Sequence, residues 1–213
     1  LPCQTELEDE SSPPAVTVVN GVALVVWPTP ARGLGAATWN GSQVRRRDVP
    51  LPGLFGSASD VVLVSSTDPA SSKAFIVFAA IPEDEIETEI YAVSVNVTYF
   101  NNGTFPDSNV FGAPLRISMS PDHGSVVPSA CWHGGSDGVL GVAWSDRRSA
   151  RRIWFRLVSG LDAFPYPASE EIDLSGSSDQ GTDPSIVCIT EQTFGVVWTD
   201  AVSLYYRRVV PAS

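Results

Sequence analysis

The chemically active side chains of this 213-residue sequence are concentrated in two charged segments. One is acidic and the other is basic, and each follows an apolar run. Their members are Glu83, Asp84, Glu85, Glu87 and Glu89 in the first, and Arg147, Arg148, Arg151 and Arg152 in the second. Carboxylates and guanidinium groups at this density can pair with each other, or can form a charged surface that docks a partner of opposite charge.

Other kinds of reactive group are scarce. The two histidines, His123 and His133, stand at no metal-ligand spacing from a cysteine or a carboxylate. The sequence contains no nucleophile elbow, phosphate-binding loop or zinc signature. A cation on a propeller axis, held by backbone carbonyls, would leave no trace in the sequence, so cofactors are left open and metal-binding residues unknown.

The elements that position these side chains are set by a repeat. An apolar run that ends in an aromatic residue occurs four times, at Trp27, Phe78, Trp144 and Trp198, with spacings of 51, 66 and 54 residues. These spacings are close to the length of a four-stranded propeller blade. The runs are short and rich in Val, which favours inner β-strands over buried helices. The sequence therefore predicts an all-β fold, a four-bladed β-propeller.

The repeat also predicts the organisation of the chain as a single domain, residues 1–213. The expected segments are a closing outer strand over residues 1–12 and blades over residues 13–52, 57–120, 125–175 and 183–213. The fourth copy lacks an outer strand, whereas residues 4–8 form an alternating segment before the first blade. We expect this N-terminal strand to complete the C-terminal blade, which would make the chain a complete unit. Donation of the strand to a neighbouring copy is the alternative.

In this arrangement, the acidic and the basic segments are equivalent turns of the second and third blades, on one face of the propeller. They could pair across the blades, at about 0–1 kcal/mol per exposed pair. Alternatively, they could form a polarised face that docks another subunit.

Composition points to a secreted chain. The formal net charge of −11 argues against nucleic acid or an anionic membrane as partner, and no apolar run is long enough for membrane insertion. The start at Leu1, without an initiator Met, suggests a processed product. Glycosylation sequons stand at Asn40, Asn96 and Asn102. We therefore expect an extracellular or cell-surface glycoprotein.

The three cysteines leave alternatives open. Cys131 and Cys188 lie in the first strands of adjacent blades, where a disulfide is plausible, but they are offset by one residue relative to a shared Pro-Ser, which would turn one side chain to the other face. Two buried thiols are the alternative. Cys3 is then free or bridges to another molecule.

Two loops share the pattern S-x-D-x-G-[ST], at residues 120–125 and 177–182. This pattern resembles the Asp box of sialidase-type propellers, without its closing aromatic and at a different place in the blade. In that family the box ties a turn and is not catalytic. The resemblance implies that a sialidase would also need an arginine triad and a tyrosine nucleophile with a carboxylate base. The available residues are Arg116, Arg156 and Arg207, with Tyr205 and Tyr206.

Equivalent repeat positions explain Arg156 and Arg207 as charges of edge strands, so the expectation is a protein that is not an enzyme. In size and blade number the chain is similar to hemopexin-like propellers, which act in binding. We expect a structural, self-assembling or protein-interaction module of an extracellular assembly, whose partners are copies of itself or other extracellular proteins. A lectin-like adhesion module is the alternative, with glycans bound near Tyr99 and Phe100, and a sialidase-like glycosidase is a third interpretation.

Overall fold

The described residues fold mainly into β-strands. The computed structural model describes residues 13–29, 33–66, 68, 70–119, 124–134, 138–146, 151–159, 170–176, 181–190 and 193–210. The described strands form four antiparallel sheets, each built from strands that are consecutive in the sequence. The prediction of an all-β chain with repeated antiparallel sheets is confirmed.

The first sheet contains β1 (Ala15–Val19), β2 (Val22–Thr29), β3 (Gly33–Trp39) and β4 (Val44–Val49). The second contains β5 (Leu54–Ser65), β6 (Lys73–Pro82), β7 (Glu89–Asn96) and β8 (Leu115–Arg116). The third contains β9 (Ser125–His133), β10 (Val139–Asp146), β11 (Arg152–Ser159) and β12 (Ile172–Asp173). The fourth contains β13 (Thr182–Thr190), β14 (Thr193–Thr199) and β15 (Leu204–Val209).

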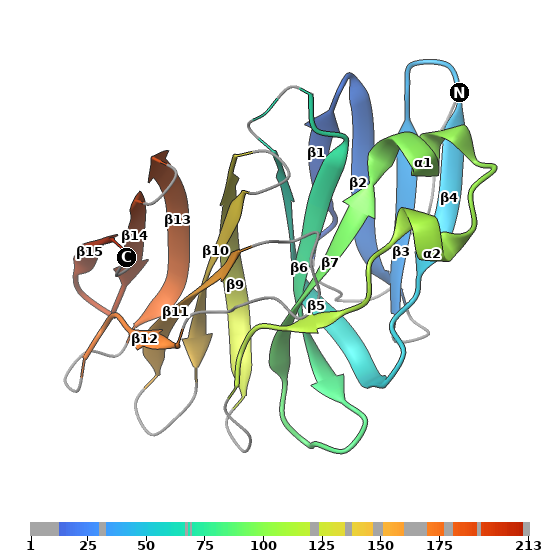
Figure 1. The fold of residues 1–213 in the computed structure, drawn as a ribbon. Coiled ribbons are helices and arrows are strands. Elements are labelled where there is room, and N and C mark those ends of the chain that lie inside the picture. Colours follow the sequence, from blue (N-terminus) through green and yellow to red (C-terminus); the bar gives the residue numbers. More distant parts are fainter. Residues whose placement is uncertain are drawn as a thin grey trace.

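The four sheets stand side by side in sequence order, with the first and the fourth at opposite ends of the row (Figure 1). The arrangement is consistent with a β-propeller, although no sheet of the described chain closes on itself. The turn between β6 and β7 and the link from β4 to β5 lie along the same edge (bottom in Figure 1). Any site built from these turns therefore lies on one face of the molecule.

The core lies between neighbouring sheets. Each repeated aromatic after the first is buried against the preceding sheet: Phe78 against the first, Trp144 against the second and Trp198 against the third. Trp27 occupies the equivalent position in the first sheet, where no sheet precedes it, and lies over Gly35. In the second, third and fourth sheets, the aromatic at the end of the second strand therefore fills the space between sheets.

Between β7 and β8 the chain leaves the second sheet and forms two short helices, α1 (Val97–Asn102) and α2 (Asp107–Val110). The side chain of Asn96 caps α1 by accepting a hydrogen bond from the Tyr99 amide, and Gly103 ends the helix at φ 77°. Phe100 is fully buried in the core shared by the first two sheets. The expectation that Phe100 is available to a ligand is therefore wrong.

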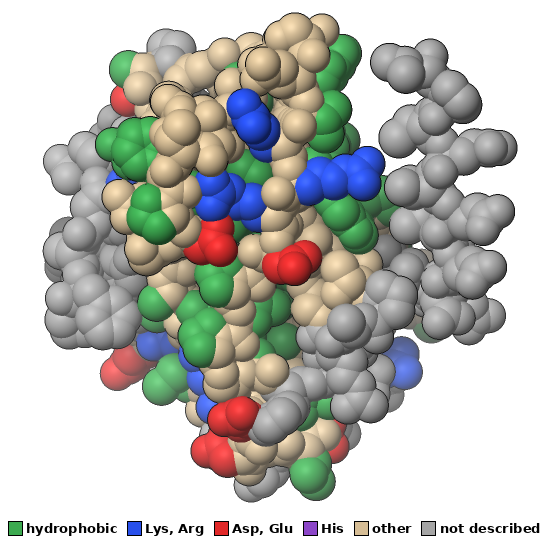
Figure 2. All heavy atoms as spheres, turned by 90° about the vertical axis from the view of Figure 1, so that its right-hand side faces the viewer, with side chains coloured by type: hydrophobic (Ala, Val, Ile, Leu, Met, Phe, Trp, Pro, Cys, Tyr) green, Lys and Arg blue, Asp and Glu red, His purple; other side chains and the backbone are tan. Residues whose placement is uncertain are grey.

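Arginine side chains of β4 hold these helices to the first sheet. Arg47 pairs with Asp107, donates to the carbonyl of Phe105 at 2.8 Å and lies over the ring of Phe100. Tyr99 stacks on Phe105 with ring centroids 4.1 Å apart, and its side chain is partly exposed. Figure 2 views the molecule from the side of β4, α1 and α2, and basic side chains form a band across this face.

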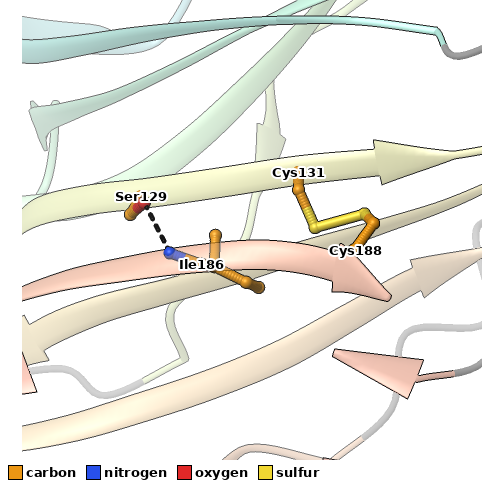
Figure 3. Close-up of a disulfide and its surroundings, with 4 residues drawn as sticks. All are labelled: Ser129, Cys131, Ile186 and Cys188. Carbon is orange, nitrogen blue, oxygen red and sulfur yellow. Dashed lines mark hydrogen bonds between the residues drawn. A yellow bond between two sulfur atoms is a disulfide. The ribbon is translucent and has the colours of Figure 1, made fainter. Parts of the chain in front are cut away.

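A disulfide joins the third sheet to the fourth. It connects Cys131 in β9 to Cys188 in β13, with the Cα atoms 5.8 Å apart (Figure 3). Close by, the Ile186 amide donates to the Ser129 hydroxyl at 3.2 Å. The offset of one residue turns the two side chains to opposite sides of their own sheets. Because the sheets are neighbours, these opposite sides face each other, and both cysteines point into the core between the third and fourth sheets. Cys3 lies outside the described residues.

In the described part of the chain, no helix is long and apolar enough to cross a membrane.

Candidate active site

A serine hydroxyl ties the outer two strands together in both the second and the third sheet. In the second sheet, the hydroxyl of Ser118 accepts a hydrogen bond from the Ile90 amide at 2.8 Å. In the third, the hydroxyl of Ser175 accepts from the Ile153 amide at 3.0 Å. The backbone repeats as well, because the amides of Ile117 and Leu174 donate to the carbonyls of Ile90 and Ile153. Both segments continue the outermost strand of their sheet.

The residues just before these repeated positions form an ion pair in each sheet, with the charges exchanged. In the second sheet, Glu89 on β7 pairs with Arg116 on β8 at 2.9 Å. In the third sheet, Arg152 on β11 pairs with Asp173 on β12, also at 2.9 Å. One function of both pairs is therefore to connect the outer two strands of a sheet.

The second sheet adds another carboxylate to this frame. Glu85, on the turn between β6 and β7, holds the Arg116 guanidinium with both carboxylate oxygens, the longer contact being 3.1 Å. Ser118 donates its hydroxyl proton to Glu89, and its carbonyl accepts from Nε of Arg116 at 2.8 Å. Two glutamates therefore share one guanidinium, which we name the Glu85–Glu89 cluster. The cluster consists of Glu85, Glu89, Arg116 and Ser118.

The two glutamates differ in their surroundings. The Glu89 side chain is completely buried, whereas that of Glu85 is 19% exposed. Burial raises the pKa of Glu89 from 4.5 to about 7, against the hydrogen bond from Ser118 and the charge of Arg116, which both lower it. Glu89 is therefore a carboxyl group that holds a proton close to neutral pH.

The raised pKa of Glu89 predicts how stability depends on pH. Since the folded protein binds this proton more tightly than the unfolded chain, the stabilisation is complete below the unfolded pKa of 4.5 and is lost as the pH rises through 7. The loss amounts to about 3 kcal/mol. We expect urea unfolding between pH 4.5 and 8 to show this decline in the native protein and to lack it in Glu89→Gln. Parallel pH profiles for the two proteins would contradict the assignment.

A protonated carboxyl group beside a second carboxylate is the arrangement used for general acid catalysis. One group can donate a proton to a leaving oxygen while the other acts as a base or a nucleophile. Glycoside hydrolysis uses two carboxyl groups in this way. Among the described residues, no group of three or more His, Cys, Asp or Glu side chains could hold a metal ion.

Among the described members of the two charged segments, the ion pairs of Glu85, Glu89 and Arg152 each lie within one sheet and do not join the segments to each other. Glu85 and Glu89 bind Arg116 of their own sheet, and Arg152 binds Asp173 of its own sheet. The expectation that Glu89 lies on an exposed turn is wrong. Glu83 and Asp84 are exposed, Glu87 is half-buried, and Arg151 is exposed, whereas Arg147 and Arg148 lie outside the described residues.

The three candidate arginines bind different carbonyls, and two of these carbonyls, of Ile117 and Ser118, are adjacent in the sequence. Arg116 belongs to the Glu85–Glu89 cluster. Arg156 donates to the carbonyl of Ile117 at 2.6 Å, and Arg207 donates to that of Leu174 at 2.9 Å. Arg156 and Arg207 therefore form equivalent ties from one sheet to the preceding one, in keeping with their equivalent positions in the repeat.

Tyr205 does meet a carboxylate. Its hydroxyl donates to Asp200 at 2.7 Å, and its ring stacks on Trp198. Asp200 also accepts the amides of Val202 and Ser203, and these bonds hold its pKa below the usual range, the tyrosine bond contributing most. Asp200 therefore closes the turn between β14 and β15. The ring of Tyr206 points to the opposite face of β15 and is exposed.

The remaining predicted residues fall at separate places. Asn40 and Asn102 are exposed, and Asn96 caps α1. The Asn102 side chain accepts a hydrogen bond from Thr104 at 2.8 Å, and that of Asn40 accepts from the Gln43 amide at 2.9 Å. His133 ends β9, whereas His123 and most of both Asp-box-like loops lie outside the described residues.

Sequence reasoning missed Ser118, Ser175 and Asp173. A signal was present, because Ile117-Ser118 and Leu174-Ser175 occupy the same place in the repeat and each follows a charged residue. The opposite signs of Arg116 and Asp173 concealed the correspondence.

No protein-family model and no curated protein sequence matches the chain. Solved structures do match. A sialidase of Trypanosoma rangeli, in complex with 2,3-difluorosialic acid as a covalent intermediate, has a TM-score of 0.54 and 11% identity over 92% of this chain. The match covers 35% of that sialidase, so the chain spans about a third of its length. An α-L-arabinofuranosidase of Clostridium thermocellum has a TM-score of 0.43 and 13% identity, covering 88% of this chain and 60% of its own.

These comparisons correct one expectation. The chain was expected to be a non-enzymatic structural or interaction module, with a lectin-like module as the alternative, but structures of a sialidase, a glycoside hydrolase, match its fold. A fold of the glycosidase kind replaces that expectation. At 11% identity the sialidase likeness concerns the fold.

Proposed function

We propose that this chain is a carbohydrate-active protein of the glycoside hydrolase kind, in which the Glu85–Glu89 cluster cleaves a glycosidic bond. The observation that carries the proposal is the buried carboxyl group of Glu89, whose pKa is raised to about 7, on the same guanidinium as the carboxylate of Glu85. The likeness in fold to the sialidase supports the class of reaction.

The two glutamates take different roles in this proposal. Glu89 is the general acid, because its proton is retained near neutral pH and can pass to the oxygen of the leaving group. Glu85 reaches the surface and is held by Arg116, so it is the group that stabilises the positive charge developing on the sugar. Glu89 is completely buried, so the side chains that cover it have to move aside when a glycoside binds, while Glu85 stays on Arg116.

The experiment is a panel of 4-methylumbelliferyl glycosides, including those of sialic acid and arabinofuranose, tested against the native protein and three variants. We expect one glycoside to be hydrolysed, and we expect Glu89→Gln to lower kcat about 10²–10⁴-fold. Glu85→Gln is expected to lower kcat as well. Glu87→Gln, on the same turn, is the matched control and retains native activity. Hydrolysis that survives both active-cluster substitutions, or an inactive native protein, would overturn the proposal.

We further propose that the four sheets are successive blades of a β-propeller. The support is that the antiparallel sheets follow one another in sequence order, and each of the last three packs on the sheet before it. The expected closing strand, residues 4–8, lies outside the described residues. A secreted, extracellular location is part of this proposal, supported by the Cys131–Cys188 disulfide and by exposed sequons at Asn40 and Asn102. Glycopeptide mass spectrometry of the natively produced chain tests the location, and unmodified peptides at both sites would contradict the sequon argument.

A further inference from the structure

The two ends of the row of sheets carry uncovered apolar faces. On the first sheet, the side of β1 that points away from the second sheet presents Val16, which is 65% exposed, and Val18. On the fourth sheet, the side that points away from the third presents Val187 and Tyr206, which are 58% and 61% exposed. Soluble proteins rarely leave contiguous apolar surface of this kind open to water.

The two faces are different, and each matches a surface that is buried inside the same chain. The first sheet presents the side that carries the repeated aromatic, here Trp27, which in the later sheets packs on the preceding sheet. The fourth sheet presents the opposite side, which in the first three sheets receives the following sheet. Three contacts inside the chain already join one side of a sheet to the other side of the next sheet. The exposed face of the fourth sheet is therefore complementary to the exposed face of the first.

A glycine lies on each of the two exposed faces, under apolar side chains of its own sheet. On the fourth sheet, Gly195 lies beneath Val187, Ile189 and Tyr206. On the first sheet, Gly35 lies beneath Trp27. The absence of a side chain at these two positions lets the bulky apolar side chains lie close to the sheet.

We propose that these faces bind a second copy of the chain, head to tail. The fourth sheet of each copy packs on the first sheet of the other, and two identical contacts close a pair. A contact between two unlike surfaces either closes into a ring or continues as a filament. Closure as a pair covers all four exposed faces, whereas a single contact between two copies leaves two of them open.

The net charge of −11 opposes this association, so the pair is expected to be stronger at higher salt. Light scattering coupled to size exclusion, over a dilution series at about 0.15 M salt, measures the mass. We expect the mass of two chains at high concentration and of one chain on dilution. A single-chain mass at every concentration and at raised salt, or assemblies longer than a pair, would overturn the proposal.

Two variants separate a head-to-tail contact from any other. Val16→Asp alters the face of the first sheet and Val187→Asp alters that of the fourth, both at exposed positions that leave the interior intact. Each variant alone is expected to lose pairing at least tenfold, since every contact in the pair then contains one altered face. An equimolar mixture regains pairing, because a mixed pair has one contact with two native faces.

If each face instead bound the same face of another copy, mixing the two variants would restore no pairing. That outcome would overturn the proposal. Val202→Asp, almost fully exposed on the turn between β14 and β15, is the matched control and leaves pairing unchanged. Circular dichroism melts of all three variants check that the monomers remain folded.

Discussion

Replacing Trp144 with alanine lowers the free energy of unfolding by about 3–5 kcal/mol. Trp144 is completely buried in the core between the second and third sheets, beside the edge-to-face pair of Phe75 and Trp132. Its removal costs the transfer energy of a large aromatic side chain and leaves a cavity that the flanking strands cannot close, because their registers are fixed by hydrogen bonds on both sides of β10. Equilibrium unfolding in urea measures the effect.

Ile86→Ala is the control for this substitution. Ile86 is 88% exposed on the turn between β6 and β7, so the change is expected to alter stability by less than about 0.5 kcal/mol. A loss of less than about 1 kcal/mol in Trp144→Ala would contradict the packing of the repeated aromatic between sheets.

Removing the disulfide produces the second large effect. The bond between Cys131 and Cys188 closes a loop with a sequence separation of 57 residues, and a loop of that length restricts the unfolded chain by about 4 kcal/mol. The double variant Cys131→Ser, Cys188→Ser is therefore expected to have a free energy of unfolding lower by about 4 kcal/mol, and to unfold at a lower urea concentration. Reduction of the native protein with dithiothreitol is expected to give the same shift.

Cys3→Ser is the matched control, since it removes a cysteine and leaves the joined pair intact. We expect its unfolding curve to match that of the native protein. Equal curves for the native protein and the double serine variant would show that the third and fourth sheets do not depend on the bond.

The repeat made the sheets predictable, because each apolar run with its final aromatic became the second strand of a sheet. Such runs carry their own information: five or six Val-rich residues fit a strand covered on both faces. Trp144 and Trp198 are buried for that reason. The arrangement of the runs in space could not be predicted, because the sequence does not specify the angle between successive sheets.

The cysteine pair shows how a local rule can mislead. An offset of one residue reverses the direction of a side chain within a strand. Cys131 and Cys188 belong to facing sides of neighbouring sheets, so that reversal is what brings their sulfur atoms together. From the sequence alone, this reversal argues against the disulfide.

The helices α1 and α2 were missed although end signals were present. Asn96 and Gly103 are a typical N-cap and C-cap, but they enclose only six residues, too few for a helical period to be recognised. The buried glutamate was missed for another reason. Five acidic residues in a short segment indicate a solvated turn, and the partner of Glu89 lies at Arg116, far along the sequence and on a strand of only two residues.

The protonation state of Glu89 tests the proposed acid most directly. Carbon-13 NMR of the glutamate carboxyl groups, titrated from pH 3 to 9 and assigned by comparison with Glu89→Gln, follows this group by itself. The account predicts a Glu89 pKa of about 7. A pKa near 4.5, the ordinary value for a glutamate, would mean that the buried carboxyl group is ionised at neutral pH, and would contradict its role as the acid.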